Sequence, residues 1–182
     1  LHIPMEPQAY PAEKPGDGAL FLRMDEEQIG QQVKEDIEAV PYIVGVNNHM
    51  GSLFMEDRRK LLVVLRQLKE KGLFFVDSLT TSHSKGREAA EEIGIRFAAR
   101  NVFIDNVQDY KKTFNIITDI LNKRNSGKME NLILIGHPHP TTVRALKEAV
   151  PYLKAKGVEI IAVSHLLEMT GEESHFKKHD MD

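Results

Sequence analysis

LLVVLRQLKEKGLFFVDS, residues 61–78, decides the fold class, because it places a helix, a helix stop and a buried strand in one short stretch. Leucine and valine recur at helical spacing from Leu61 to Leu68, and Gly72 is a typical helix terminator. The run Leu73–Val76 follows at once and is too short for a helix. It is apolar at every position, which indicates a strand buried on both faces.

The same alternation of helix and strand is expected on both sides of this stretch. Upstream, Asp25 and Gln28 form a capping-box signal before a helix that ends ahead of Pro41. The remaining expected elements are strands at 42–46, 95–98, 102–104, 132–135 and 158–163, and helices at 87–93, 110–121 and 141–156 with a short closing helix after Ser164. The long Pro- and Gly-containing segment 5–23 is expected to be an irregular loop.

Strands that alternate with helices through short connections predict a parallel sheet covered by helices. Both an open doubly wound sheet and a (β/α) barrel satisfy this pattern. No G-x-G-x-x-G or P-loop motif follows any expected strand, so the sequence gives no nucleotide-binding reason to choose the open sheet.

Composition narrows the possible functions. The chain has 182 residues, which suits one domain, expected over residues 1–170 and followed by a polar tail at 171–182. The net charge is −3 and the basic residues form no stripe, which argues against nucleic acid as a partner. No apolar run approaches the length of a membrane span. The absence of cysteine excludes disulfides and thiolate zinc sites.

The chain begins with Leu1–Pro4, a segment that looks like the middle of a strand rather than a natural start. We therefore expect further sequence upstream, including any targeting segment.

Polar side chains follow the expected strands at their carboxyl ends, where the sites of both α/β architectures form. These residues are His2 and Glu6, Asn47–His49, Asp77 and Ser78, Asp105 and Asn106, and Gly136–His139. Helix capping or turn formation explains any one of these residues, but it explains three histidines poorly. Carboxylates and imidazoles on one rim are typical of a site for zinc or another divalent metal. Asp77 and Asp105 also keep open a glycosidase with paired carboxylates.

Five ordered strings, HIPMEP, GVNNHMGS, FFVDSLTT, VFIDN and ILIGHPHP, resemble the divergent polysaccharide deacetylases. The resemblance covers nearly all of the chain up to about Glu168. It implies a distorted (β/α) barrel of the polysaccharide deacetylase type, with parallel strands covered by helices and a divalent metal at the strand ends. It also implies that N-terminal strands, including an Asp-Asp strand, lie upstream of residue 1.

The resemblance further implies roles for single residues. His2, His49 and Glu6 are the expected metal ligands, with Glu6 standing where the wider group has its second histidine, so that His49 could replace it. His137 is the expected general acid, and Asp77 the carboxylate that orients the catalytic groups. Asn47, Asn48, Gly51 and Asp105 are expected to bind substrate, with Gly51 letting the backbone approach an oxyanion.

The implied function is metal-dependent removal of acetyl groups, with zinc the expected ion, from an acetylated polysaccharide or a peptidoglycan-like glycan. Such a substrate implies an exported protein of the cell envelope or its surroundings. Two alternatives stay open. One is a non-catalytic envelope protein that binds a glycan or a partner, and the other is metal-independent hydrolysis of a glycosidic bond by Asp77 and Asp105.

Overall fold

The computed structural model describes residues 1–125 and 131–169, and the expected polar tail lies outside these ranges. The chain divides into two compact units. Unit 1 comprises residues 1–99 with the segment from residue 167, and unit 2 comprises residues 100–166. The single domain expected over residues 1–170 stays a prediction, because compactness alone does not test independent folding.

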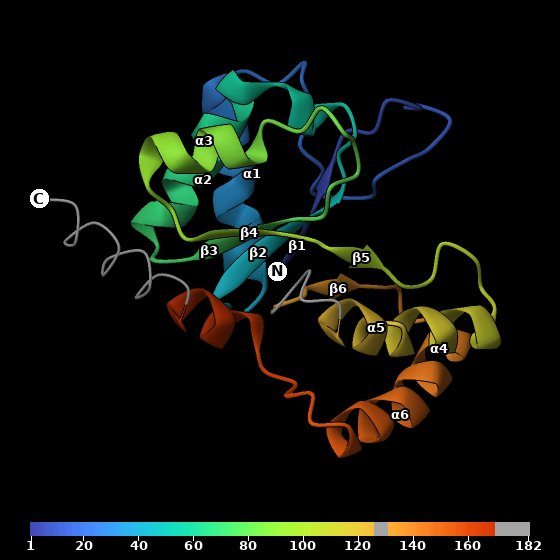
Figure 1. The fold of residues 1–182 in the computed structure, drawn as a ribbon. Helices are drawn as coiled ribbons and strands as arrows, with labels where there is room; N and C mark the ends of the chain where they lie inside the picture. Colours follow the sequence, from blue (N-terminus) through green and yellow to red (C-terminus); the bar gives the residue numbers. More distant parts are fainter. Residues whose placement is uncertain (126–130, 170–182) are drawn as a thin grey trace, which may run out of the picture. The chain divides into compact units, whose positions relative to one another are not determined.

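Unit 1 is built on a parallel sheet in the order β1-β2-β3-β4 (Figure 1). Its strands are β1 (His2–Met5), β2 (Gly45–Met50), β3 (Phe74–Asp77) and β4 (Phe97–Ala99). The helices α1 (Glu26–Ala39), α2 (Arg58–Glu70) and α3 (Gly86–Ile93) cover one face of this sheet, and a short 3-10 helix, η1 (Phe54–Glu56), precedes α2 (Figure 1). The predicted parallel strands covered by helices are confirmed.

Local sequence signals account for the helices of unit 1. The capping box that begins α1 is formed, since the Asp25 carboxylate accepts from the Gln28 amide at 2.8 Å and the Gln28 side chain accepts from the Asp25 amide at 2.9 Å. Gly94 ends α3 with φ 62°, the left-handed conformation that glycine adopts without strain. One core of fully buried side chains joins the helices to the sheet, including Ile3, Met5, Ile29, Val33, Leu61, Leu65 and Phe75.

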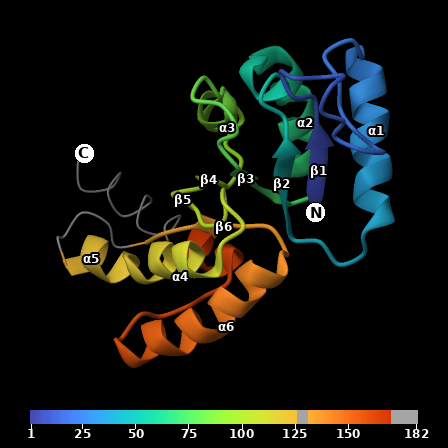
Figure 2. The ribbon, with the colours of Figure 1, turned by 90° about the vertical axis from the view of Figure 1, so that its right-hand side faces the viewer.

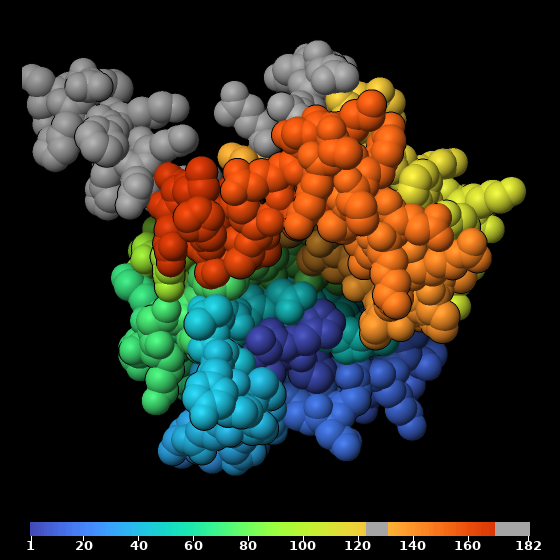
Figure 3. All heavy atoms as spheres, turned by 90° about the horizontal axis from the view of Figure 1, so that it is seen from below, coloured from blue at the N-terminus to red at the C-terminus, as the bar shows by residue number. Residues whose placement is uncertain are grey.

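The segment between β1 and α1 is irregular, as predicted, and it is fixed to the sheet at Leu20, which is fully buried and forms a bridge with Met5. The connection between α1 and β2 lies open at the surface beside the start of β1 (Figure 3). There, Tyr42 is fully exposed and has φ 62°. The predicted strand at 42–46 is therefore wrong in its first residues, because Tyr42, with its left-handed backbone, cannot take part in a β-ladder, and β2 begins only at Gly45.

Among its described residues, unit 2 packs helices against a pair of short parallel strands (Figure 2). The elements are β5 (Val102–Phe103), β6 (Leu134–Ile135), α4 (Tyr110–Thr118), α5 (Ile120–Asn125) and α6 (Pro140–Ala155). Its core includes Ile104, Ile117, Ala145, Ala149 and Leu153, which pack α4 and α6 beneath the strands.

The strand expected at 158–163 is wrong. Residues 158–162 form no strand, and helix begins at residue 163 and continues to 169. The stretch has strand-like composition, but Ile160 is 46% exposed, so it lacks the burial that would favour a strand there. None of the helices within the described ranges is both long enough and apolar enough to cross a membrane.

Candidate active site

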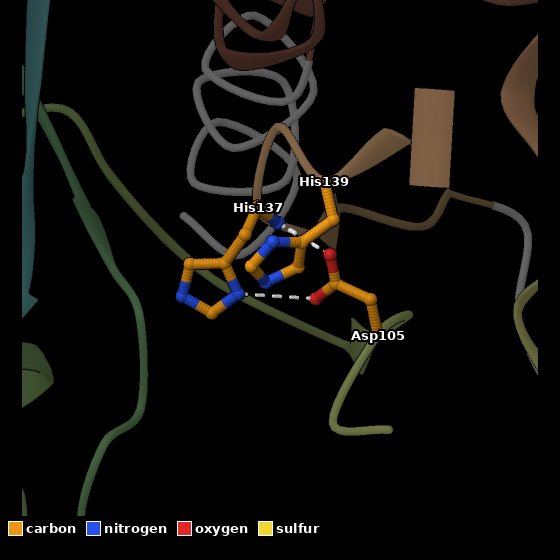
Figure 4. Close-up of side chains that lie close together, drawn as sticks. All are labelled: Asp105, His137 and His139. Carbon is orange, nitrogen blue, oxygen red and sulfur yellow. Dashed lines mark hydrogen bonds and ion pairs between the residues drawn. The ribbon is translucent and has the colours of Figure 1, made fainter. Parts of the chain in front are cut away.

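Asp105 and His137 form a close pair at the carboxyl ends of β5 and β6 (Figure 4). The Asp105 side chain is buried, and its Oδ2 accepts a hydrogen bond from the backbone N–H of His137 at 2.6 Å. The Nδ1 atom of His137 lies 3.2 Å from Oδ1 of Asp105, so a protonated Nδ1 donates to the carboxylate. This contact leaves Nε2 available for chemistry on a ring that is 49% exposed.

Thr142 completes the surroundings of Asp105. Its hydroxyl, in the first turn of α6, donates to Oδ2 at 2.8 Å. Burial alone would raise the pKa of Asp105, but the hydrogen bonds from Thr142 and His137 outweigh burial and lower it. Asp105 is therefore an anion at neutral pH, and its carboxylate fixes the orientation of the His137 ring through Nδ1 and the backbone N–H.

The close approach of the two strand ends depends on Gly136. A Cβ atom at this position would lie 2.6 Å from Cγ1 of Ile104 and 3.2 Å from Oδ2 of Asp105. A larger residue would push the segment carrying His137 away from the carboxylate.

His139 lies beside the pair, with its ring centroid 5.3 Å from that of His137 (Figure 4). Within the described ranges, the group of three potential metal ligands is Asp105, His137 and His139, whose ligand atoms lie within 4.8 Å of one another. The sequence placed His139 in the GHPHP string but gave it no role, although the H-x-H spacing was a signal that could have identified it. Thr142 carried no signal, because its role depends on α6 starting at Pro140.

The second set of expected site residues lies in unit 1, where the structure corrects their placement. GVNNHM is itself strand β2, so Asn47, Asn48 and His49 lie within a strand and not after it. β2 pairs with β1 on one side and β3 on the other, and this pairing overrides the low strand propensity of asparagine. His2 likewise begins β1 and does not end it.

The register places three of these side chains together. His2 is aligned with Asn47, and His49 follows Asn47 by two residues, so all three share one face of the sheet. The rings of His2 and His49 have centroids 4.9 Å apart. The opposite face carries Ile3 and Val46 into the core against the helices.

Asn48 and Gly51 build the end of β2. Asn48 is 0% exposed, with its Oδ1 accepting from the Ser78 amide at 2.8 Å and its Nδ2 donating to the Met50 carbonyl at 2.8 Å. Gly51 has φ +86°, and a Cβ there would lie 2.9 Å from Cβ of Met5. These contacts give both residues a structural role, while Asn47 is half-buried and donates to the Ser78 hydroxyl at 3.3 Å.

Asp77 and Glu6 both fix loops. Asp77 is 1% exposed, and its two oxygens accept from the Leu79 amide at 2.8 Å and the Ser84 hydroxyl at 2.5 Å. Glu6 accepts from the Leu22 amide at 2.6 Å. Glu6 does not join His2 and His49 in a three-ligand group within the described part of the chain.

Glu56 links the loops that follow three strands, and no pattern in the sequence indicated this role. Its Oε1 accepts from the Gln8 side chain at 3.0 Å and from the Thr81 hydroxyl at 2.6 Å, and it lies 3.6 Å from Nδ1 of His83. These partners follow β1 and β3, while Glu56 itself follows β2.

Comparison with known proteins identifies relatives along almost the whole chain. A family described as divergent polysaccharide deacetylase matches residues 1–167. The uncharacterized protein YibQ of Escherichia coli K12 is 33% identical over 171 residues, covering 92% of this chain and 51% of YibQ. An uncharacterized protein of Haemophilus influenzae Rd is 31% identical over 169 residues, covering 91% of this chain and 58% of that protein. The chain thus spans about half the length of the curated relatives it matches.

The fold also matches a solved structure. The crystal structure of the uncharacterized protein ATU2773 from Agrobacterium tumefaciens C58 aligns with a TM-score of 0.85 at 22% identity, covering 91% of this chain and 66% of that one. This likeness shows that the two chains share a fold of parallel strands and helices.

Proposed function

The chain belongs to the divergent polysaccharide deacetylase family, and from this premise we propose that it is a metal-dependent hydrolase that removes acetyl groups from a polysaccharide or cell-wall glycan. The Asp105–His137 pair carries the proposal. A buried carboxylate that fixes one nitrogen of an imidazole and leaves the other accessible is the arrangement of a general acid or base.

The family implies a divalent ion, and the donors of unit 1 fit one in part. His2 and His49 are neighbouring imidazoles on adjacent strands, and imidazole nitrogen is a preferred donor for zinc. Glu6 fits less well, because its Oε2 accepts from the Leu22 amide. His2 and His49 are the expected ligands of this ion, whose chemistry would be to polarise an acetyl carbonyl and to lower the pKa of a water molecule.

His137 supplies the proton that the reaction requires. Hydrolysis adds one water, breaks the bond from the acetyl carbon to the sugar nitrogen or oxygen, and requires a proton on that atom as it leaves. The imidazolium of His137 delivers this proton from Nε2, while Asp105 keeps the ring oriented and balances its charge. The products are acetate and the free amine or hydroxyl of the glycan.

Residues near His2 and His49 would contact the substrate. Asn47 shares their face of the sheet and is half-buried, so its amide is suited to bind a sugar hydroxyl or the acetyl oxygen. Asn48, Gly51 and Asp77 would act by holding the backbone in position around it. A polymeric glycan substrate also makes export to the cell envelope part of this proposal.

The test is acetate release from a panel of N-acetylated and O-acetylated oligosaccharides, with chelator-treated protein and with protein reloaded with Zn²⁺. We expect release only after reloading. His137→Ala should lower kcat by about 10²–10⁴-fold with the first equivalent of zinc still bound. His83→Ala is the matched control, since His83 is an exposed histidine that contacts Glu56. An unchanged rate in His137→Ala would remove the residue from the mechanism.

The position of Glu6 favours a second candidate, a non-catalytic protein that binds a glycan or a partner in the cell envelope. Glu6 holds a loop through the Leu22 amide at the position where the wider group has a histidine ligand. Such a replacement is expected in a protein that has lost its metal site. Glycan binding without acetate release, at any metal loading, would support this candidate. Glycosidic hydrolysis by Asp77 and Asp105 would continue in the presence of a chelator.

A further inference from the structure

Asp105, His137 and His139 offer a set of metal donors within unit 2 alone. One carboxylate and two imidazoles lie within 4.8 Å of one another, with the carboxylate buried and both rings at least partly exposed. Two imidazoles with one carboxylate is a donor set found in open transition-metal and zinc sites.

The segment that carries the two histidines is held in place before any ion binds. The backbone N–H of His137 is fixed on Asp105 at 2.6 Å, and Gly136 packs against Ile104. Pro138 separates the histidines and Pro140 begins α6 directly after His139, so the backbone between the two rings has little freedom. A site that needs little backbone ordering loses less entropy on binding.

Closing this site onto an ion needs only side-chain rotation. Tetrahedral zinc holds its nitrogen and oxygen donors roughly 3.3 Å apart, and the donor atoms here lie within 4.8 Å of one another. The His137 ring is 49% exposed and so has room to turn toward His139. Asp105 can either bind the ion directly or keep its contact with Nδ1 while Nε2 binds the ion.

We propose that these three residues form a binding site of their own for a borderline divalent ion such as Zn²⁺ or Co²⁺, and that occupancy of this site blocks proton donation by His137. The imidazoles favour such ions over Mg²⁺ and Ca²⁺. A metal-bound imidazole is not an imidazolium, so His137 has no proton to deliver while the ion is present. Excess metal therefore inhibits. The part of the proposal that concerns inhibition rests on the proposed function, whereas the part that concerns metal binding does not.

Metal titration of the full, chelator-treated chain tests the part that concerns metal binding. Co²⁺ is followed by its visible absorption and Zn²⁺ by calorimetry, in the wild type, His139→Gln, His49→Ala and the control His83→Gln. We expect a weaker second equivalent whose affinity falls by about tenfold or more in His139→Gln and is unchanged in His49→Ala and His83→Gln.

Acetate release across the same zinc series tests the part that concerns inhibition. The wild type, His139→Gln and His83→Gln are each normalised to their own rate with one equivalent of zinc. The wild-type rate should fall as the second equivalent binds, and His139→Gln should need about tenfold more zinc for the same fall.

Three results would overturn the proposal. One is an unchanged affinity for the second equivalent of metal in His139→Gln. Another is an equal loss of that affinity in His83→Gln, which would show unspecific binding to exposed histidines. The third is a single equivalent that both His49→Ala and His139→Gln weaken, because the two donor sets would then hold one ion. Absence of acetate release from the wild type at every zinc level would refute the proposed function and the inhibition, while the titration still decides the binding.

Discussion

Replacing Thr142 with valine tests whether Asp105 is held as a buried anion. The substitution keeps the shape of the side chain but removes the hydroxyl that donates to Oδ2 of Asp105 at 2.8 Å. Hydrogen bonds to charged groups contribute about 1.5–3 kcal/mol, so Thr142→Val should lower the free energy of unfolding by about 2 kcal/mol at pH 7. Urea denaturation followed by circular dichroism measures this difference.

The loss should depend on pH in a defined direction. The pKa of Asp105 is lowered in the folded protein, so its contribution to stability is complete above its ordinary pKa and is lost as the pH falls through the folded value. Thr142→Val brings the folded pKa closer to the ordinary one. The difference in stability between the two proteins should therefore be constant above the ordinary pKa of 3.8 and should shrink as the pH falls below it.

Thr113 provides the matched control. It is a buried threonine of α4 in the same unit, and its Oγ1 has no hydrogen-bond partner within the described ranges. Thr113→Val should be neutral or stabilising, because it removes an unsatisfied polar group. If Thr142→Val were no less stable than Thr113→Val at pH 7, or if its deficit were the same at low pH, the hydrogen bond would not hold Asp105 ionised.

Three further substitutions test other parts of the structure. Gly136→Ala should cost about 1–3 kcal/mol in urea denaturation and lower acetate release, because its Cβ would meet Ile104 at 2.6 Å; wild-type behaviour in both assays would contradict the close approach. Asp25→Ala should cost about 0.5–2 kcal/mol through loss of the α1 capping box, and no change would mean that the helix end is held by other contacts. Glu6→Ala should cost about 1–3 kcal/mol, because the part-buried Leu22 amide loses its charged acceptor, and zinc content should be unchanged; loss of zinc would make Glu6 a ligand.

Local signals predicted the helices well, because caps and glycine stops act within a few residues. The capping box at Asp25 and the helix terminator Gly72, which has φ 71° just after α2, both lie where the sequence predicts them. Strands were harder, since a strand needs partners that the sequence does not reveal. GVNNHM became a strand because β1 and β3 flank it, and residues 158–162 did not form one.

Two residues of the candidate site could be predicted from the sequence, but their contacts could not. Strand ends pointed to Asp105 and His137, because parallel neighbours bring their carboxyl ends to one edge. The pairing of these two residues depends on β5 lying beside β6, and the part played by Thr142 depends on where α6 begins. Neither fact is contained in a local pattern.

The contact between Glu6 and the Leu22 amide has a consequence for redesign. Restoring a histidine at position 6, to rebuild the histidine pair of the wider group, would remove the acceptor that anchors the far end of the loop from residue 7 to 21. The substitution would add a possible metal ligand, but it would also loosen the loop, because the Leu22 amide would lose its acceptor. A successful redesign needs a compensating change that gives the Leu22 amide a new acceptor, so residue 6 and its loop have to be exchanged as one module.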